Sequence, residues 1–311
     1  MSQRPGADWA APDTDAIGRI LDLVRAARVT DGVEALSGHV LDALATTSAL
    51  QIVEGDDLLG VAVISGDDPA ELLVHPDHRG RGIGGRLLDA TLARRPRVWA
   101  HGDLPAARAL AAARDLGAVR MLLQLRRTLA GLPPQPALPD GVRVRTFDPA
   151  SDLAQFLGVN ARAFAWHPEQ GRLDDAGMRH EMAQPWFDPA GFFLAVTDEG
   201  RDEVGGSDRV LGFHWTKIHE VDPTPVRPGS GEQAAPSGPV GEVYVIAVDP
   251  LSPVRRLGEP LTLVGLHHLA GRGRQTVMLY VEGDNPSALA LYRRLGFGEW
   301  ATDVVYADQR S

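Results

Sequence analysis

A basic, glycine-rich stretch follows directly after a short apolar run in the first third of the chain. The run is Leu72-Leu73-Val74, and the stretch carries the spacing Arg79-x-x-Gly82-x-Gly84 ahead of an amphipathic pattern. Glycines let successive backbone N–H groups turn inward and let a pyrophosphate approach without meeting a Cβ, and a helix N-terminus adds positive potential. The stretch therefore predicts a strand, an anion-binding loop and a helix, although an ordinary strand-to-helix turn has the same outline.

The second half of the chain repeats the frame of this stretch. Val248-Asp249-Pro250 and residues 254–261 match the first loop in order, and residues 99–105 are echoed by residues 280–286. The matches keep a nearly constant offset along the chain. This pattern indicates a duplicated domain.

Composition limits the classes of function. The chain has 311 residues, a net charge of −10 and no cysteine. Its acidity argues against nucleic-acid binding, so the basic loop is expected to bind a small anion. The missing thiols exclude disulfides, thiolate metal sites and a cysteine nucleophile, and they suit a cytoplasmic protein. We also expect no metal, no membrane segment, and a monomer.

Hydrophobic periodicity predicts a similar order of elements in both halves. A first helix is expected to begin near Asp15. Further helices are expected at residues 38–44, 83–94, 105–116, 153–163, 259–271 and 286–295. The expected strands span 50–54, 58–65, 71–75, 97–100, 120–127, 142–146, 192–196, 210–219, 241–248, 277–282 and 303–307. The proline-rich segment 131–141 is expected to link a first domain, 1–130, to a second, 142–311.

This element order, with Arg-x-x-Gly-x-Gly between strand and helix, resembles the GNAT family of N-acetyltransferases. The resemblance implies an α/β fold of two tandem GNAT domains, each a mixed central sheet flanked by helices, and a loop that holds the pyrophosphate of acetyl-CoA. Motifs of the second half resemble the tandem GNAT enzymes that acetylate the cysteinyl amine of a cysteinyl-glucosaminyl-inositol, an amino-thiol glycoside. These motifs occupy residues 165–171, 186–189, 212–217, 241–245 and 279–282.

Acetylation of an amine needs a base for the nucleophile and an acid for the leaving thiolate. By resemblance Glu242 matches the family's base and Tyr292 its general acid. A solvated glutamate at a strand end and a half-buried core tyrosine are the plain alternatives for these two residues.

The resemblance also assigns binding residues. Acceptor contacts are expected at Gly38, Glu169, Lys217, Glu242 and Tyr280. Acetyl-CoA contacts in the first half are expected at Leu72, Leu73, Val74, Gly80, Arg81, Gly82, Ile83, Gly84 and Gly85. In the second half they are expected at Ile246, Ala247, Val248, Pro253, Val254, Arg255, Arg256, Leu257, Gly258, Glu259, Asn285, Pro286, Ser287, Ala288, Leu289 and Ala290. A backbone N–H near 246–248 would stabilise the oxyanion.

The sequence departs from the family pattern at two places. Pro253 and Arg256 stand where the second loop should carry a polar residue and a glycine, so a Cβ is expected where phosphate approaches, with the arginine charge as partial compensation. Gly38 replaces a family glutamate that reaches the acceptor, and Glu34 lies nearby in the sequence.

The two halves are not equivalent. Tyr292 aligns with Ala111 and Asn285 with Leu104, so the first half is expected to bind acetyl-CoA without catalysing transfer. Two other functions are consistent with the sequence. The chain could acetylate a different amine, such as a peptide N-terminus, or it could bind acetyl-CoA at the first loop without being an enzyme.

Overall fold

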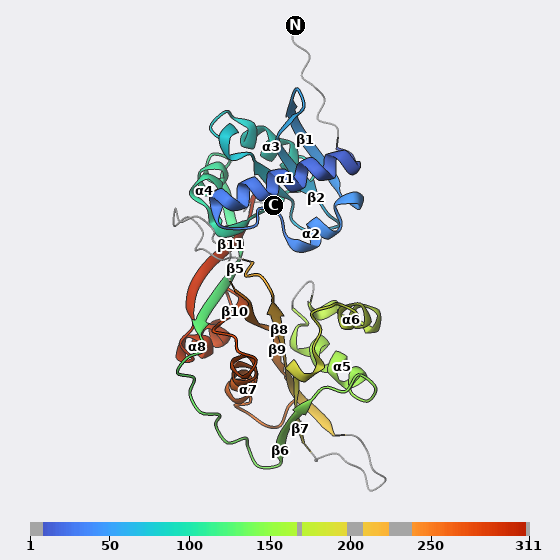
Figure 1. Ribbon diagram of the computed structural model, residues 1–311, viewed down its shortest axis with the longest axis vertical. Helices are drawn as coiled ribbons and strands as arrows, with labels where there is room; N and C mark the ends of the chain where they lie inside the picture. The colour runs from blue at the N-terminus through green and yellow to red at the C-terminus, as the bar shows by residue number, and fades with distance from the viewer. Residues whose placement is uncertain (1–8, 167–169, 198–207, 224–237, 309–311) are drawn as a thin grey trace.

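The computed structural model describes residues 9–166, 170–197, 208–223 and 238–308. Two lobes are stacked along the long axis of the molecule, and long strands run between them (Figure 1). The helices are α1 (Thr14–Asp31), α2 (Gly38–Asp42), α3 (Ile83–Leu92), α4 (Pro105–Ala112), α5 (Leu153–Ala163), α6 (Asp175–Met182), α7 (Gly258–Gly271) and α8 (Pro286–Arg294). The strands are β1 (Ser48–Glu54), β2 (Asp57–Ile64), β3 (Glu71–Val74), β4 (Arg97–Ala100), β5 (Leu116–Thr128), β6 (Val142–Thr146), β7 (Phe192–Thr197), β8 (Arg209–His219), β9 (Val240–Val248), β10 (Thr276–Glu282) and β11 (Gly298–Asp308).

The first lobe is built on the antiparallel sheet β1-β2-β3, which has helices on both faces. Asp13 caps helix α1, because its carboxylate accepts a hydrogen bond from the Ala16 amide at 2.8 Å. Its apolar stripe, including Ile20 and Leu23, packs on one face of the sheet, while Ile83 and Leu87 of α3 pack on the other. This arrangement fixes the N-terminus of α3 at the end of β3.

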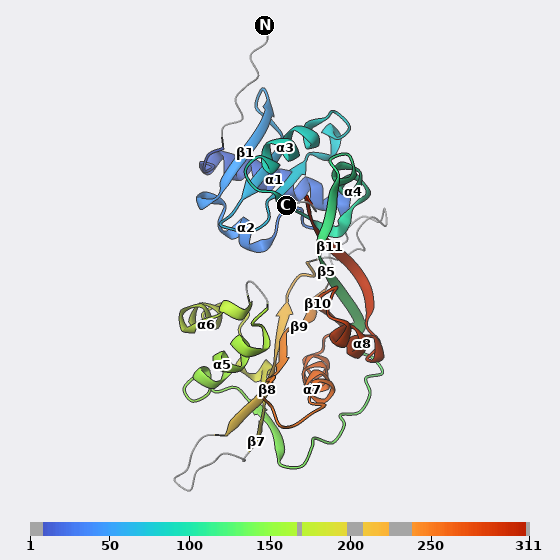
Figure 2. The ribbon, with the colours of Figure 1, turned by 180° about the vertical axis from the view of Figure 1, so that it is seen from behind.

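The two halves of the chain exchange strands in one eight-stranded sheet, in the order β4-β11-β5-β10-β9-β8-β7-β6. Strand β5, from the first half, lies between β11 and β10. Strand β11, from the end of the chain, lies between β4 and β5. Both views show β5 and β11 crossing together from one lobe to the other (Figures 1 and 2). Each lobe is therefore completed by a strand from the opposite half of the chain.

The second lobe is a three-layer structure. Leucines of α7, with Leu289 and Tyr292 of α8, cover one face of β9, β10 and β5. On the other face, Phe156 of α5 and Met178 of α6 pack against aromatic residues of β7 and β8. The part of this second face nearest the first lobe carries the polar residues described below.

The structure confirms the predicted α/β element order, with a few differences. Helix α6 was not predicted, because its sequence is short and carries few apolar residues. Helix α4 ends at Ala112, four residues before the predicted end, ahead of Asp115 in the left-handed region at φ 51°. Strands β5 and β11 are longer than predicted because each spans both lobes. The linker 131–141 contains no helix or strand.

Candidate active site

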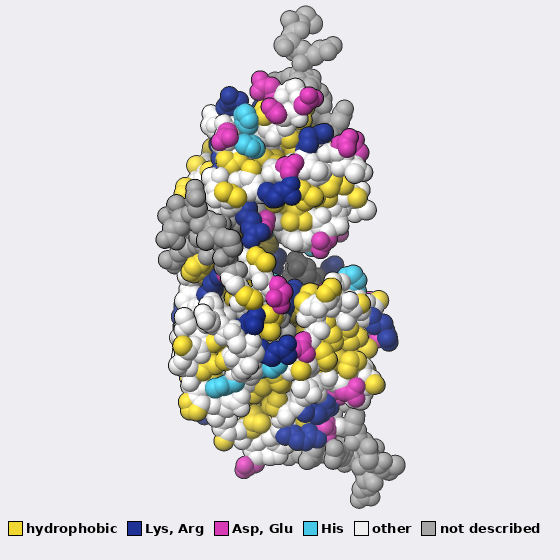
Figure 3. All heavy atoms as spheres, viewed as in Figure 1, with side chains coloured by type: hydrophobic (Ala, Val, Ile, Leu, Met, Phe, Trp, Pro, Cys, Tyr) yellow, Lys and Arg dark blue, Asp and Glu magenta, His cyan; other side chains and the backbone are white. Residues whose placement is uncertain are grey.

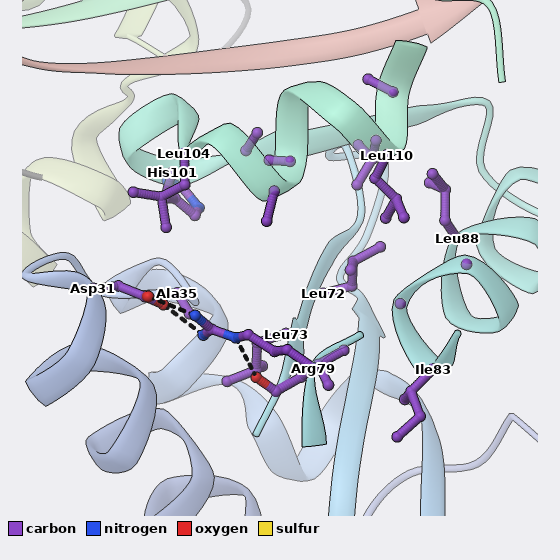
Figure 4. A pocket seen from close by; sticks show the side chains of 18 of the residues that line it. Asp31, Ala35, Leu72, Leu73, Arg79, Ile83, Leu88, His101, Leu104 and Leu110 are labelled. Atoms are coloured by element: carbon purple, nitrogen blue, oxygen red, sulfur yellow. Dashed lines mark hydrogen bonds and ion pairs between the residues drawn. The ribbon is translucent and has the colours of Figure 1, made fainter. Parts of the chain in front are cut away.

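The first-half loop and its neighbours line a cavity of about 330 Å³. Among the acetyl-CoA contacts expected in this half, all but Arg81 line it. Gly80 and Gly82 have φ values of 77° and 78°, and a Cβ added to either residue would meet no atom within 4 Å. Figure 4 shows apolar side chains, including Leu72, Leu104 and Leu110, facing the cavity. An apolar cleft that ends at a helix N-terminus suits an acyl chain carrying a phosphate.

Arg79 is engaged within the protein. Its guanidinium binds both oxygens of Asp31, at the end of α1, at 2.7 Å, and its Nε donates to the Val74 carbonyl at 3.2 Å (Figure 4). The charge of the first loop is therefore partly neutralised by a carboxylate that also lines the cavity.

The second-half loop keeps one left-handed position of the first, the one that aligns with Gly82, despite its different residues. Arg256, which replaces the glycine, has φ 63°, close to the value of Gly82. Arg255 and Arg256 are exposed, and neither has a hydrogen-bond or ion-pair partner among the residues that the structure describes. The loop thus combines a left-handed residue with two unpaired cations at the N-terminus of the 14-residue helix α7.

Neighbouring parallel strands separate beside each loop. Strand β9 pairs with β10 only over 241–243 and 277–279, so residues 246–248 have no partner on the β10 side. In the first lobe the equivalent contact is a single bridge, Ala70 to Val98. Of the expected second-half contacts, Ala247, Leu257 and Leu289 are buried. Asn285 caps α8 by accepting a hydrogen bond from the Ala288 amide at 3.1 Å.

Strand register brings several polar side chains together on one face of the sheet. Lys217 is opposite Glu242, Glu242 is beside Met278, and Tyr280 is opposite Gln124. Because residues two apart on a strand share a face, the set extends along each strand. We call it the polar face: Gln124, Arg126, Lys217, His219, Glu242, Tyr244 and Tyr280. Asp222, which binds Arg126 of this face, also contacts the first lobe, since its carbonyl accepts from Arg28 of α1 at 3.3 Å. The surface is hollowed between the lobes (Figure 3).

Glu242 lies at the centre of the polar face and is 6% exposed. Its Oε2 is 2.6 Å from Nε2 of His219, and no other described residue forms a hydrogen bond with its carboxylate. One carboxylate oxygen is thus available to a proton donor from outside the protein.

Lys217 is held between two aromatic rings. Its Nζ lies 4.1 Å from the ring centroid of Trp186 and 4.9 Å from that of Tyr244. Burial, and then the negative charges of Glu181 and Glu242, raise the pKa of Tyr244, so the phenol stays protonated. Lys217 therefore presents a fixed positive charge next to Glu242.

The other polar-face residues are linked through the first-half strand β5. Gln124 donates to the Tyr280 hydroxyl at 2.7 Å and accepts from Arg126 at 3.0 Å. Arg126 binds both carboxylate oxygens of Asp222 at 2.6 and 2.7 Å, and lies over the ring of Trp300. The first half of the chain thus supplies two of the polar residues on the face that holds Glu242.

Tyr292 is separated from this face by the sheet. It is 6% exposed and packs against Phe297 at a ring distance of 5.6 Å, and its hydroxyl has no hydrogen-bond partner among the described residues. Burial raises the pKa of Tyr292 to about 12, so the phenol holds its proton at neutral pH.

A second buried glutamate occupies the junction of the lobes. Glu71 accepts from the Ser37 amide and hydroxyl, both at 2.6 Å, and lies 3.4 Å from His101. The other ring nitrogen of His101 is 3.5 Å from Asp303 of β11. Burial alone would lower the pKa of His101, but Asp303 and Glu71 raise it to about 10. Gly38 follows Ser37 directly, so it is adjacent to this cluster.

The structure places Lys217, Glu242 and Tyr280 on one face of the sheet and Tyr292 on the other, and Gly38 lies in the first lobe next to Ser37. Glu169 lies outside the described residues. Sequence reasoning missed His219, Gln124 and Arg126. Lys217 and His219 are two residues apart on a predicted strand, and this spacing indicates that they share a face. No such signal exists for Gln124 and Arg126, because β5 reaches this face only through its pairing with β10.

Comparison with known proteins places this architecture in a family. Residues 47–117 match the description "Acetyltransferase (GNAT) domain", and residues 160–297 match "Acetyltransferase (GNAT) family". The chain is 45% identical over 297 residues to a mycothiol acetyltransferase of Thermobispora bispora, covering 92% of this chain and 94% of that protein. It is 47% identical over 319 residues to that of Mycolicibacterium gilvum, covering 96% and 97%.

Solved structures support the fold. A tandem GNAT protein from the clavulanic acid biosynthesis pathway superposes with a TM-score of 0.65 at 20% identity, covering 96% of both chains. A GCN5-related N-acetyltransferase from Sphaerobacter thermophilus has the same TM-score at 21% identity, covering 98% of this chain and 96% of that one. Within the described ranges, no helix has the length and apolar character needed to cross a membrane.

Proposed function

This chain belongs to the mycothiol acetyltransferase family and is an N-acetyltransferase, and on that premise we propose that it transfers acetyl from acetyl-CoA to the cysteinyl amine of cysteinyl-glucosaminyl-inositol, giving mycothiol and CoA. The observation that carries the proposal is the burial of the Glu242 carboxylate and its small number of hydrogen-bond partners. Glu242 is a buried carboxylate with a single partner among the described residues, on a face that also holds Lys217 and Tyr280. Such a group can remove a proton from an amine.

Each residue of the proposed site has its own role in the reaction. Glu242 takes the proton of the attacking amine as the N–C bond forms. Tyr292, as general acid on the other side of the sheet, gives its proton to the sulfur as the C–S bond breaks, through the gap where β9 and β10 separate. An unpaired backbone N–H between Ile246 and Val248 stabilises the developing oxyanion. Lys217 and Tyr280 bind the hydroxyl-rich acceptor, together with Gly38 and Glu169.

Acetyl-CoA, when bound, supplies the acetyl group as a thioester. In the second half, the left-handed backbone at Arg256 and the guanidiniums of Arg255 and Arg256 fit a pyrophosphate at the start of α7. Residues 285–290, the cap and the first turns of α8, flank the same molecule. We assign residues 142–311 as the catalytic domain and residues 1–130 as an acetyl-CoA-binding domain without transferase activity, joined by the linker 131–141.

Two measurements on the full chain test this proposal. Calorimetry with acetyl-CoA should give two binding sites, of which one is lost when Gly82 and Gly84 are replaced. Mass spectrometry after addition of the cysteinyl-glucosaminyl-inositol amine should then show an acetylated product that resists hydroxylamine, since an amide survives this reagent and a thioester does not. Acetylation of peptide amines but not of this amine would contradict the proposed acceptor. One binding site and no product would indicate a binding protein.

A further inference from the structure

We infer that His219 is a positioning residue that holds Glu242 ready to take the proton of the acceptor amine. The inference rests on the proposed role of Glu242 and concerns how that role is achieved. A carboxylate only accepts hydrogen bonds, so in the 2.6 Å contact the Nε2 of His219 must carry the hydrogen. The imidazole therefore occupies Oε2 and leaves Oε1 for the amine.

The strands fix this geometry. His219 is the last residue of β8, and Lys217, two residues before it, is directly opposite Glu242 on β9. The His219 side chain is 21% exposed and that of Glu242 is 8% exposed, so the pair is close enough to solvent for an acceptor to reach it. Glu242 is the one partner of His219 among the described residues. The ring therefore has no second carboxylate to hold it, unlike His101.

The other charged groups nearby are already engaged. Lys217 lies over Trp186 and Tyr244, and Arg126 is bound to Asp222. Glu220 and Asp222 follow His219 in the chain. The titratable groups of β9, β10 and β11 on this side include Tyr244, Tyr280, Asp303 and Glu282, and Glu282 is paired with Arg120 at 2.7 Å. Among the described residues, His219 alone can orient the carboxylate through a direct hydrogen bond.

The experiment compares His219→Leu, which removes the donor, with His219→Gln, whose amide nitrogen can donate from a similar place without titrating. The leucine variant should lower kcat about ten- to hundredfold, a part of what a general base contributes. It should also move the acid limb of the kcat profile upward by about one pH unit, because the carboxylate loses a charge-assisted hydrogen bond. The glutamine variant should restore most of kcat and the position of the limb.

His180→Leu is the matched control, because His180 is an exposed histidine on α6 and lies outside the polar face. It should leave kcat and the pH profile unchanged. If His219→Leu does not fold, as judged by circular dichroism, His219→Asn replaces it, since the shorter amide cannot reach Glu242.

Two results would overturn the inference. One is equal kcat and equal acid limbs in the leucine and glutamine variants. The other is a loss of kcat in His219→Leu without movement of the limb, which would indicate a structural role. If the wild-type chain acetylates an amine other than the cysteinyl amine, the proposed acceptor is wrong, but the same variants measured on that amine still decide the role of His219.

Discussion

In the first lobe Glu71 accepts two hydrogen bonds from Ser37 and lies beside His101, which is itself held by Asp303. In the second lobe Glu242 is bound among the described residues by His219 alone. Both lobes therefore bury a glutamate next to a histidine, but the described residues contact both oxygens of Glu71 and only one oxygen of Glu242. A carboxylate whose lone pairs are taken up by the protein stabilises a junction, whereas a carboxylate with one open oxygen can do chemistry.

The two loops differ in a complementary way. The first has glycines at the left-handed positions and an arginine neutralised by Asp31, while the second has an arginine at such a position and two cations without partners among the described residues. The glycines of the first loop adopt the left-handed conformation without strain, whereas the second loop carries more unpaired positive charge. The left-handed position that aligns with Gly82 is thus occupied by an arginine in the second loop, which a motif based on glycine spacing alone does not anticipate.

The largest difference in kcat is expected between two glutamate-to-glutamine substitutions, one in each lobe. Glu242→Gln removes the base and should lower kcat by about 10²- to 10⁴-fold. Glu71→Gln should leave kcat nearly unchanged, and should lower the melting temperature because it removes the negative charge opposite His101. Product formation followed by mass spectrometry, together with thermal unfolding, separates these outcomes. Equal losses of kcat would show that the lobes are not specialised as the contacts suggest.

The strand exchange gives the next largest effect. Arg126 of β5 and Asp222 form a buried ion pair, with side-chain exposures of 8% and 9%. Arg126→Met removes the guanidinium that binds both oxygens of this buried carboxylate and should reduce the free energy of unfolding by about 3–5 kcal/mol, measured by urea denaturation.

The control for Arg126→Met is Arg272→Met, which breaks the exposed pair with Asp188. It should change the free energy of unfolding by less than about 1 kcal/mol. Similar effects of the two substitutions would mean that Asp222 is solvated when Arg126 is absent.

The sequence was sufficient for the order of the elements, because apolar periodicity, proline and glycine mark most of their ends. It also pointed to Lys217, Glu242 and Tyr280, which the sheet register brings together. It could not show that β5 pairs with β10 of the second half and β11 with β4 of the first, since strand pairing between the halves depends on contacts far apart in the chain. For the same reason Gln124 and Arg126, residues of the first half, were not expected beside Glu242.

The junction cluster predicts a pH dependence of stability. Burial opposes the charge of His101, yet Asp303 and Glu71 raise its pKa to about 10, above the value near 6.5 in an unfolded chain. The folded state therefore binds the proton more tightly, so this contribution is complete below pH 6.5 and is lost as the pH rises to about 10. His101→Gln should lower the melting temperature most at pH 6 and progressively less toward pH 10. The same substitution at the exposed His180 should have little effect at any pH, and a pH-independent loss in His101→Gln would show that packing rather than charge is responsible.

The smallest effect concerns the left-handed residue of each loop. A non-glycine residue in this region costs about 1–2 kcal/mol, which is partly offset by the lower entropy of its unfolded chain. Arg256→Gly should therefore raise the free energy of unfolding by up to about 1 kcal/mol, and Gly82→Ala should lower it by a similar amount, both measured by urea denaturation. Arg256→Gly should nevertheless weaken acetyl-CoA binding at the second site about tenfold in calorimetry, because a charge-assisted hydrogen bond to phosphate is lost. A gain in stability with unchanged affinity would mean that Arg256 contributes only strain, and that the phosphates are held by the backbone of the loop and by Arg255.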